Sequence, residues 1–115
     1  MVLWIGFDLQ AEIEAVDGNN RTALHYAAVY GNEAVAAKLL QAGASVSAVD
    51  DGGSTPLHYA ARCGKSSIAN LLLQANASPT AVDKYGYTPA QYAKQYSHGV
   101  LAAMLLEEEQ AGALK

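Results

Sequence analysis

The chain of 115 residues repeats itself at a constant distance of 33 residues. Residues 55–64 read TPLHYAARCG, residues 22–31 read TALHYAAVYG, and residues 88–97 read TPAQYAKQYS. A constant period without insertion or deletion is typical of a solenoid, in which copies of one small unit stack on each other. Stacked copies share one continuous core, so three of them can be stable where a single copy is not.

One copy is predicted to contain two helices. Thr55 is a good N-cap because its hydroxyl accepts from exposed amides, and Pro56 suits the first helical position because its missing N–H costs nothing there. Gly64 is suited to the left-handed backbone that ends such a helix. A second helix is predicted over residues 66–73, and Asn76 is expected in the left-handed conformation after it. Each copy therefore reads as helix, turn, helix and extended loop.

The pattern D-x-x-G-x-T-P-L-H-x-A-A-x-x-G, followed by L-L-x-x-G-A, resembles the ankyrin repeat. The resemblance covers residues 17–115 and implies an all-α solenoid of stacked helix-turn-helix units joined by β-turn loops. The residues of the middle copy that match the pattern are Asp50, Gly53, Thr55, Pro56, Leu57, His58, Ala60, Ala61 and Gly64.

The domain organisation follows from the same period. Repeats are predicted at residues 17–49, 50–82 and 83–115, the last of them acting as a C-terminal cap. Residues 1–16 do not make a full copy and are interpreted as an N-terminal cap or a partial repeat. Their apolar side chains would cover one end of the stack.

Apolar residues at helical spacing predict the core of the stack. Leu57 and Leu72 are expected to be buried in the middle copy. Val35, Leu39 and Leu40 are expected to form the inner stripe of the second helix of the first copy.

The third copy departs from the pattern at positions that the inner copies pack. Gln91 replaces histidine, Lys94 replaces alanine and Ser97 replaces glycine, which indicates a face turned to water. The chain then carries three consecutive glutamates from Glu107. Negative charge at a helix C-terminus opposes the macrodipole, so the helix is expected to fray beyond Glu107.

Composition excludes several classes of function. The net charge of −4 and the pI of about 5.1 argue against nucleic-acid binding, which needs a basic face. No apolar run approaches the roughly 20 residues that span a bilayer, so no integral membrane association is expected. The apolar N-terminus lacks a basic leader, and a single cysteine suits a reducing compartment, so a cytoplasmic location is expected. We expect a monomer, with self-association through the apolar N-terminus as the alternative.

No residue constellation predicts an enzyme, a metal site or a cofactor. His25 and His58 recur at the same position of successive copies, and the family resemblance implies a structural role, with each ring bonding threonine and backbone. No cysteine or carboxylate pair stands beside them at ligand spacing. Cys63 is alone and has no neighbouring base in sequence.

Tyrosine is the residue that points to function, with seven in the chain. Tyr26, Tyr59 and Tyr92 recur at the period of 33 and are interpreted as packing residues whose hydroxyls need partners. The other tyrosines occupy positions that vary between copies, which in ankyrin proteins line a concave groove and contact partners. Tyr and Arg are also enriched at interface hot spots. The predicted partner-binding residues are Arg21, Tyr30, Asp51, Arg62, Lys84, Tyr85, Tyr87 and Tyr96.

The leading functional hypothesis is a protein–protein interaction module or scaffold that binds another protein through this groove. The alternative comes from residues 21–27, 42–46 and 48–50, which are similar to the ankyrin segment of plant chaperones. Those chaperones deliver membrane proteins to the chloroplast outer envelope. That resemblance implies a cytosolic chaperone with lipid head-group contact.

Overall fold

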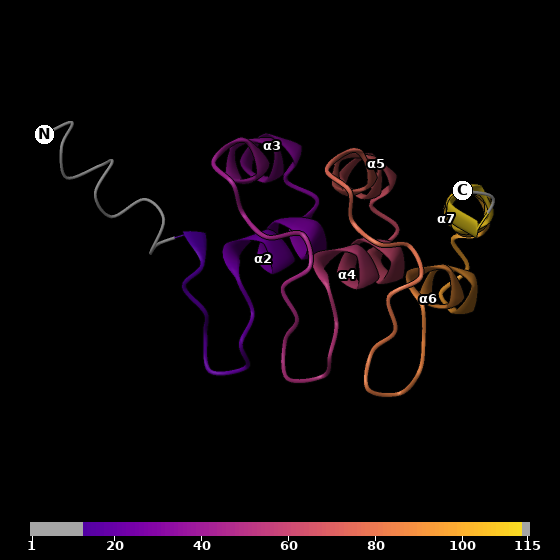
Figure 1. The fold of residues 1–115 in the computed structure, drawn as a ribbon, viewed down its shortest axis with the longest axis horizontal. Coiled ribbons are helices and arrows are strands. Elements are labelled where there is room, and N and C mark those ends of the chain that lie inside the picture. The colour runs from indigo at the N-terminus through magenta and orange to yellow at the C-terminus, as the bar shows by residue number, and fades with distance from the viewer. Residues whose placement is uncertain (1–12, 114–115) are drawn as a thin grey trace, which may run out of the picture.

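The computed structural model describes residues 13–113 and contains helices but no strand within them. The helices form three successive pairs, as Figure 1 shows. The first helices of the pairs form one layer, the second helices form another, and the connections between pairs extend away from the second layer. The predicted all-α class is confirmed. The helices are α2 (Ala23–Tyr30), α3 (Glu33–Gln41), α4 (Pro56–Cys63), α5 (Ser66–Gln74), α6 (Pro89–Gln95) and α7 (Gly99–Ala113).

Each first helix begins with a reciprocal cap. The Thr55 hydroxyl oxygen accepts from the His58 N–H at 3.3 Å, and His58 Nδ1 accepts from the Thr55 N–H at 3.1 Å. Two otherwise unpaired amides are satisfied in this way. The predicted cap at Thr55 and the predicted start at Pro56 are confirmed. The equivalent pairs are Thr22 with His25 and Thr88 with Gln91.

The loops between pairs are β-turns that bond to one another. The Gly53 N–H donates to the Asp50 carbonyl at 2.9 Å and closes one turn. The Asp51 N–H donates to the Asn19 carbonyl of the preceding loop at 3.0 Å. In the same way, the Lys84 N–H of the third loop donates to the Gly52 carbonyl of the second loop at 2.9 Å. Backbone hydrogen bonds therefore join successive copies at the loops as well as through the helices.

The core lies between the two helical layers. Leu57 of α4 and Leu72 of α5 are fully buried, as predicted, and Leu24, Ile68 and Leu105 extend the same cluster along the stack. Helix α4 packs against α2, α5 and α6, so it lies at the centre of the described residues.

The prediction for Val35 is wrong. Its side chain is 42% exposed, whereas Ile68, at the same position one copy later, is only 1% exposed. Ile68 lies on α5, which packs on α3. Ala36 is fully buried in its place, and Leu39 and Leu40 are half-buried.

The last pair turns polar side chains outward, as predicted. Gln91 and Lys94 are exposed, although the equivalent residues of the middle copy are buried. The predicted fraying beyond Glu107 is not observed, because α7 continues to Ala113. The last turns of α7 lie beside the connection that follows α5, where Glu109 is half-buried. This packing outweighs the charge-dipole repulsion, which is only about 0.3–1 kcal/mol at an exposed helix end.

Ser97 holds a backbone conformation that favours glycine. Its φ of 67° lies in the left-handed region, like the φ of 70° at Gly31 and at Gly64, which end the other two first helices. A side chain in this region places Cβ close to a carbonyl oxygen, which costs about 1–2 kcal/mol.

Replacing Ser97 with glycine is therefore expected to stabilise the chain by about 1 kcal/mol, measured as the free energy of unfolding in urea. Ser67 provides the matched control, because it is an exposed serine inside α5. Ser67→Gly should destabilise the chain by about 0.5 kcal/mol through helix propensity. A loss of stability in both variants would contradict the strain assigned to Ser97.

Candidate functional site

Each first helix carries a tyrosine that is bonded to an aspartate of the preceding loop. The Tyr59 hydroxyl donates to Oδ2 of Asp50, nine residues earlier. The other oxygen of Asp50 accepts from the N–H groups of Gly52 and Ser54, both at 2.9 Å. One carboxylate therefore holds the turn and attaches it to the helix. The equivalent pairs are Tyr26 with Asp17 and Tyr92 with Asp83.

These contacts shift the pKa values of the three aspartates and of Tyr59 and Tyr92. The Tyr26 hydroxyl, followed by the Arg21 backbone N–H, lowers the pKa of Asp17 to about 2. Burial and the bond to Asp83 raise the pKa of Tyr92 to about 12. Near neutral pH Asp17 is therefore ionised and Tyr92 protonated, which suits a structural pair rather than proton transfer.

The two histidines link consecutive copies. The Nε2–H of His58 donates to the Tyr87 carbonyl at 2.8 Å, and that of His25 donates to the Ser54 carbonyl at 2.9 Å. Because a carbonyl only accepts, Nε2 carries the proton and Nδ1 is the acceptor in the cap. Burial, partly offset by the carbonyl, lowers the pKa of each ring. The predicted bonds of each ring to threonine and to backbone are confirmed.

The lowered histidine pKa values predict a loss of stability in mild acid. The unfolded chain takes up protons on these rings below about pH 6.5, whereas the folded chain does so only at lower pH. The free energy of unfolding should therefore fall as the pH is lowered from about 7.5 to about 5. His58→Gln should reduce this fall, because glutamine does not titrate. Urea unfolding at both pH values measures it.

Gln91 shows that glutamine fits this position of the repeat, since its Oε1 accepts from the Thr88 N–H at 2.8 Å. His58→Gln should therefore keep the cap but lose the bond to the Tyr87 carbonyl, and stability at neutral pH should drop. If His58→Gln leaves the pH dependence of the unfolding free energy unchanged, His58 takes up no proton when the chain unfolds.

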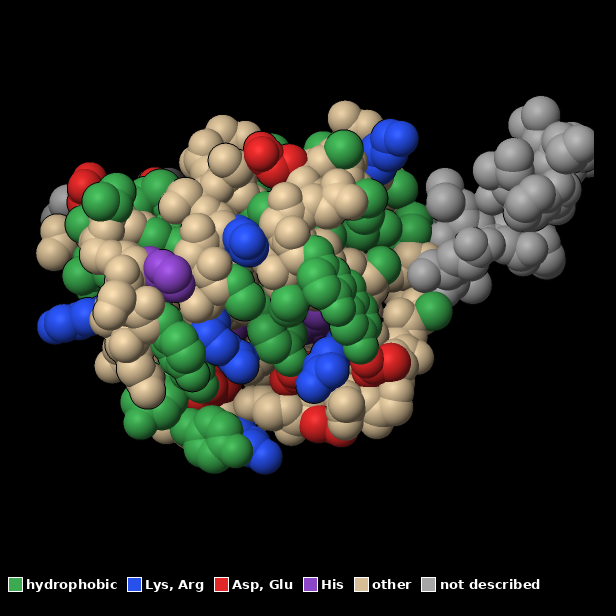
Figure 2. Space-filling view, turned by 180° about the vertical axis from the view of Figure 1, so that it is seen from behind, with side chains coloured by type: hydrophobic (Ala, Val, Ile, Leu, Met, Phe, Trp, Pro, Cys, Tyr) green, Lys and Arg blue, Asp and Glu red, His purple; other side chains and the backbone are tan. Residues whose placement is uncertain are grey.

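Two arginines lie between these tyrosines. The Arg62 guanidinium carbon is 5.0 Å from the ring centroid of Tyr59 and 5.3 Å from that of Tyr92. The phenol groups of Tyr26 and Tyr59 lie beside Arg21 and raise its pKa. We call Tyr26, Arg21, Tyr59, Arg62 and Tyr92 the tyrosine–arginine row. Figure 2 shows the face that carries it, where basic side chains lie between hydrophobic ones and acidic side chains lie close by.

The tyrosine–arginine row borders two adjacent hollows, of 330 Å³ and 270 Å³. Both arginines and Tyr59 line both hollows. Tyr30 lines the smaller hollow, while Tyr87 lines neither and packs its ring edge against Tyr92 with the centroids 5.4 Å apart. The structure therefore brings most of the predicted residues together. Those lining the larger hollow are Arg21, Asp51, Arg62, Lys84, Tyr85 and Tyr96.

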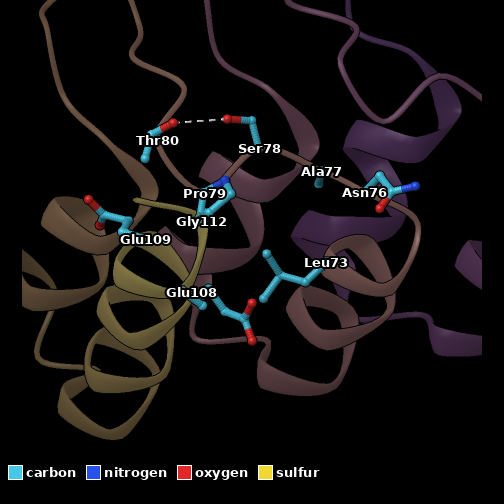
Figure 3. Close-up of a pocket in the computed structure, with 10 residues that line it drawn as sticks. Leu73, Asn76, Ala77, Ser78, Pro79, Thr80, Glu108, Glu109 and Gly112 are labelled. Carbon is cyan, nitrogen blue, oxygen red and sulfur yellow. Dashed lines mark hydrogen bonds between the residues drawn. The ribbon is translucent and has the colours of Figure 1, made fainter. Parts of the chain in front are cut away.

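Figure 3 shows a third hollow, of 540 Å³, between α7 and the connection after α5. Glu108 and Glu109 reach it from α7, and Ser78 and Thr80 lie on the connection with their hydroxyls 3.1 Å apart. None of the residues predicted to bind a partner lines this hollow.

Sequence reasoning missed the tyrosine–aspartate pairs. It interpreted the recurring tyrosines as packing residues, and Tyr59 does pack its ring edge-on against His25 of the preceding copy, with centroids 5.3 Å apart. It did not identify Asp50 as the partner of the Tyr59 hydroxyl. The signal was present, because both residue types recur at the period of 33, with each tyrosine nine positions after its aspartate.

Comparison with protein families agrees with this architecture. A family model described as ankyrin repeats, in three copies, matches residues 3–83 and 48–113. No curated protein matches the chain. Within residues 13–113, no helix has the length and apolar character needed to cross a bilayer, and no three His, Cys, Asp or Glu side chains gather as a metal site.

Proposed function

The chain belongs to the ankyrin-repeat family, whose members generally are protein–protein interaction modules and typically are not enzymes, and from this premise we propose a binding surface. The partner protein lies across the loop tips and first helices, over the two hollows of the tyrosine–arginine row. The surface spans repeats that we place at residues 17–49, 50–82 and 83–115. We place this binding in the cytoplasm, where the single thiol of Cys63 stays reduced.

The observation that supports this surface is a gathering of exposed aromatic side chains. Tyr30, Tyr85, Tyr87 and Tyr96 are all exposed, and Tyr85 is 67% exposed. Large exposed aromatic groups on one face are informative because they mark interaction sites. Tyrosine and arginine are also the side chains that most often dominate binding energy.

The surface is held in place before any partner arrives. Asp50 fixes its turn and bonds Tyr59, and His58 bonds the next loop through the Tyr87 carbonyl. A rigid surface loses little conformational entropy on binding, so more of the contact energy appears as affinity.

A ligand for testing this proposal can be selected from a displayed library of random peptides, with the folded chain as bait. Its affinity is then measured for Tyr30→Ala, in the smaller hollow, and for Val100→Ala, at an exposed position of α7. We expect weaker binding in the first variant and unchanged binding in the second. Unchanged binding in Tyr30→Ala together with weaker binding in Val100→Ala would show that the partner binds the second helices instead.

The chaperone hypothesis remains a second proposal, and the observation that favours it is the basic part of the larger hollow. Arg21, Arg62 and Lys84 line that hollow and could meet lipid head groups. Flotation of the chain with liposomes tests this reading. Flotation that is lost when these side chains are neutralised would support lipid contact, and a chain that stays at the bottom would reject it.

A further inference from the structure

The tyrosine–arginine row contains cationic donors without acceptors. The Nε–H groups of Arg21 and Arg62 are buried, and neither has a hydrogen-bond partner among the described residues. Each guanidinium is instead held by the tyrosines on either side of it. Burying a charged donor without an acceptor costs free energy, and any ligand contact must be made by the other N–H groups of the two guanidiniums, which line the hollows.

Most carboxylate oxygens of the same hollow already accept hydrogen bonds. Both oxygens of Asp50 and of Asp83 accept from a tyrosine hydroxyl and from backbone N–H groups. Oδ1 of Asp51 accepts from Nδ2 of Asn20 at 2.6 Å. Three aspartates balance the charges of Arg21, Arg62 and Lys84 in this hollow, but their oxygens mostly serve the turns and tyrosines, so the guanidinium N–H groups are the donors left for an anion.

The arrangement suits a planar anion in particular. A guanidinium presents its N–H groups in a flat fork that matches the two oxygens of a carboxylate, and a lysine does not. The Arg62 guanidinium already packs against the Tyr59 and Tyr92 rings, so part of its side-chain entropy is lost before a ligand binds. The net charge of −4 disfavours general attraction of anions, so recognition here must come from the local fork.

We propose that the tyrosine–arginine row is a carboxylate-binding site and that the partner segment in the hollows is an acidic peptide. The inference rests on the proposed function and names the chemistry of the partner. Arg21 and Arg62 flank Tyr59, so each receives one carboxylate of the segment. In an extended peptide, side chains on one face recur about every 6.7 Å, so acidic residues at alternating positions present their carboxylates on one face.

The probe is a fluorescein-labelled peptide of about eight residues that alternates glycine with glutamate, long enough to extend along both hollows. Its control alternates glycine with glutamine. Fluorescence anisotropy at low salt measures the Kd of each peptide for the whole chain. We expect the glutamate peptide to bind at least about tenfold more tightly, as charge-assisted hydrogen bonds imply. Equal binding of the two peptides, or binding of neither, overturns the proposal.

Arg62→Lys tests the fork separately from the charge. We expect this variant to lose most of the preference for glutamate while melting as a single transition. Arg21→Lys is the second variant and should behave in the same way, which keeps the test decisive if Arg62→Lys does not fold. Lys38→Gln, at an exposed position of α3, removes a charge elsewhere and should change nothing. Full preference for glutamate in both arginine variants overturns the proposal.

Vesicles of phosphatidylglycerol, tested against vesicles of phosphatidylcholine, give the last arm. Arginine-dependent binding to the anionic vesicles, without a preference for the glutamate peptide, assigns the site to a lipid and overturns the proposal. If the carboxylate proposal fails, the proposed protein-binding function can still be tested. A library-selected ligand without acidic residues can bind this surface and depend on Tyr30.

Discussion

Replacing Leu57 with alanine should destabilise the chain by about 2–5 kcal/mol, the cost of a cavity at a buried leucine. Leu57 is fully buried in α4, which packs against α2, α5 and α6. A cavity there affects the contacts of all three described pairs, because each copy of a stack is stabilised by its neighbours. Urea unfolding followed by far-UV circular dichroism measures the change.

Leu106→Ala is the matched control for this prediction. Leu106 lies on α7 in the last pair and is 46% exposed, so its truncation should cost less than about 1 kcal/mol. Similar losses for Leu57 and Leu106 would show that α4 is not at the centre of the core.

Tyr85→Ala should weaken binding of a groove ligand by about 2 kcal/mol or more, as truncation of a hot-spot aromatic does. The Tyr85 ring lines the larger hollow, and its neighbour Lys84 places Nζ 5.2 Å from the ring centroid. The ring is mostly exposed, so folding does not depend on it. Titration of a library-selected ligand measures the affinity, and the melting temperature is measured in parallel.

Tyr85→Phe separates the ring from the hydroxyl. Phenylalanine keeps the aromatic surface, so most of the affinity should remain if the ring is the anchor. Unchanged binding in Tyr85→Ala would exclude Tyr85 as an anchor. A fall in melting temperature that parallels the loss of binding would instead show that the side chain acts through the fold.

Much of the fold follows from the sequence because the period of 33 repeats local signals that act within one copy. The cap at Thr55 and the left-handed residues Gly64 and Asn76 are all found where they were predicted. The second helix of the middle copy ends one residue later than predicted, at Gln74. These features depend on residues close in sequence, so one copy is enough to predict them.

The features that sequence reasoning missed depend on neighbours in other copies or on the ends of the stack. Val35 is exposed, although Ile68 has the same periodic position one copy later and is buried. Arg62 lies against Tyr92, which is 30 residues away, and no equivalent arginine recurs in the other copies. Such contacts need the stacking geometry and cannot be found from one copy.

The most direct test of the central claim, that the loop tips and first helices bind the partner, is a map of backbone amides by NMR. Spectra of the labelled chain are compared with and without a library-selected ligand. Amides along the tyrosine–arginine row and near Tyr85 should shift, while those of α3 and α5 should stay in place. Shifts confined to α3, α5 and α7, with the row unchanged, would contradict the account.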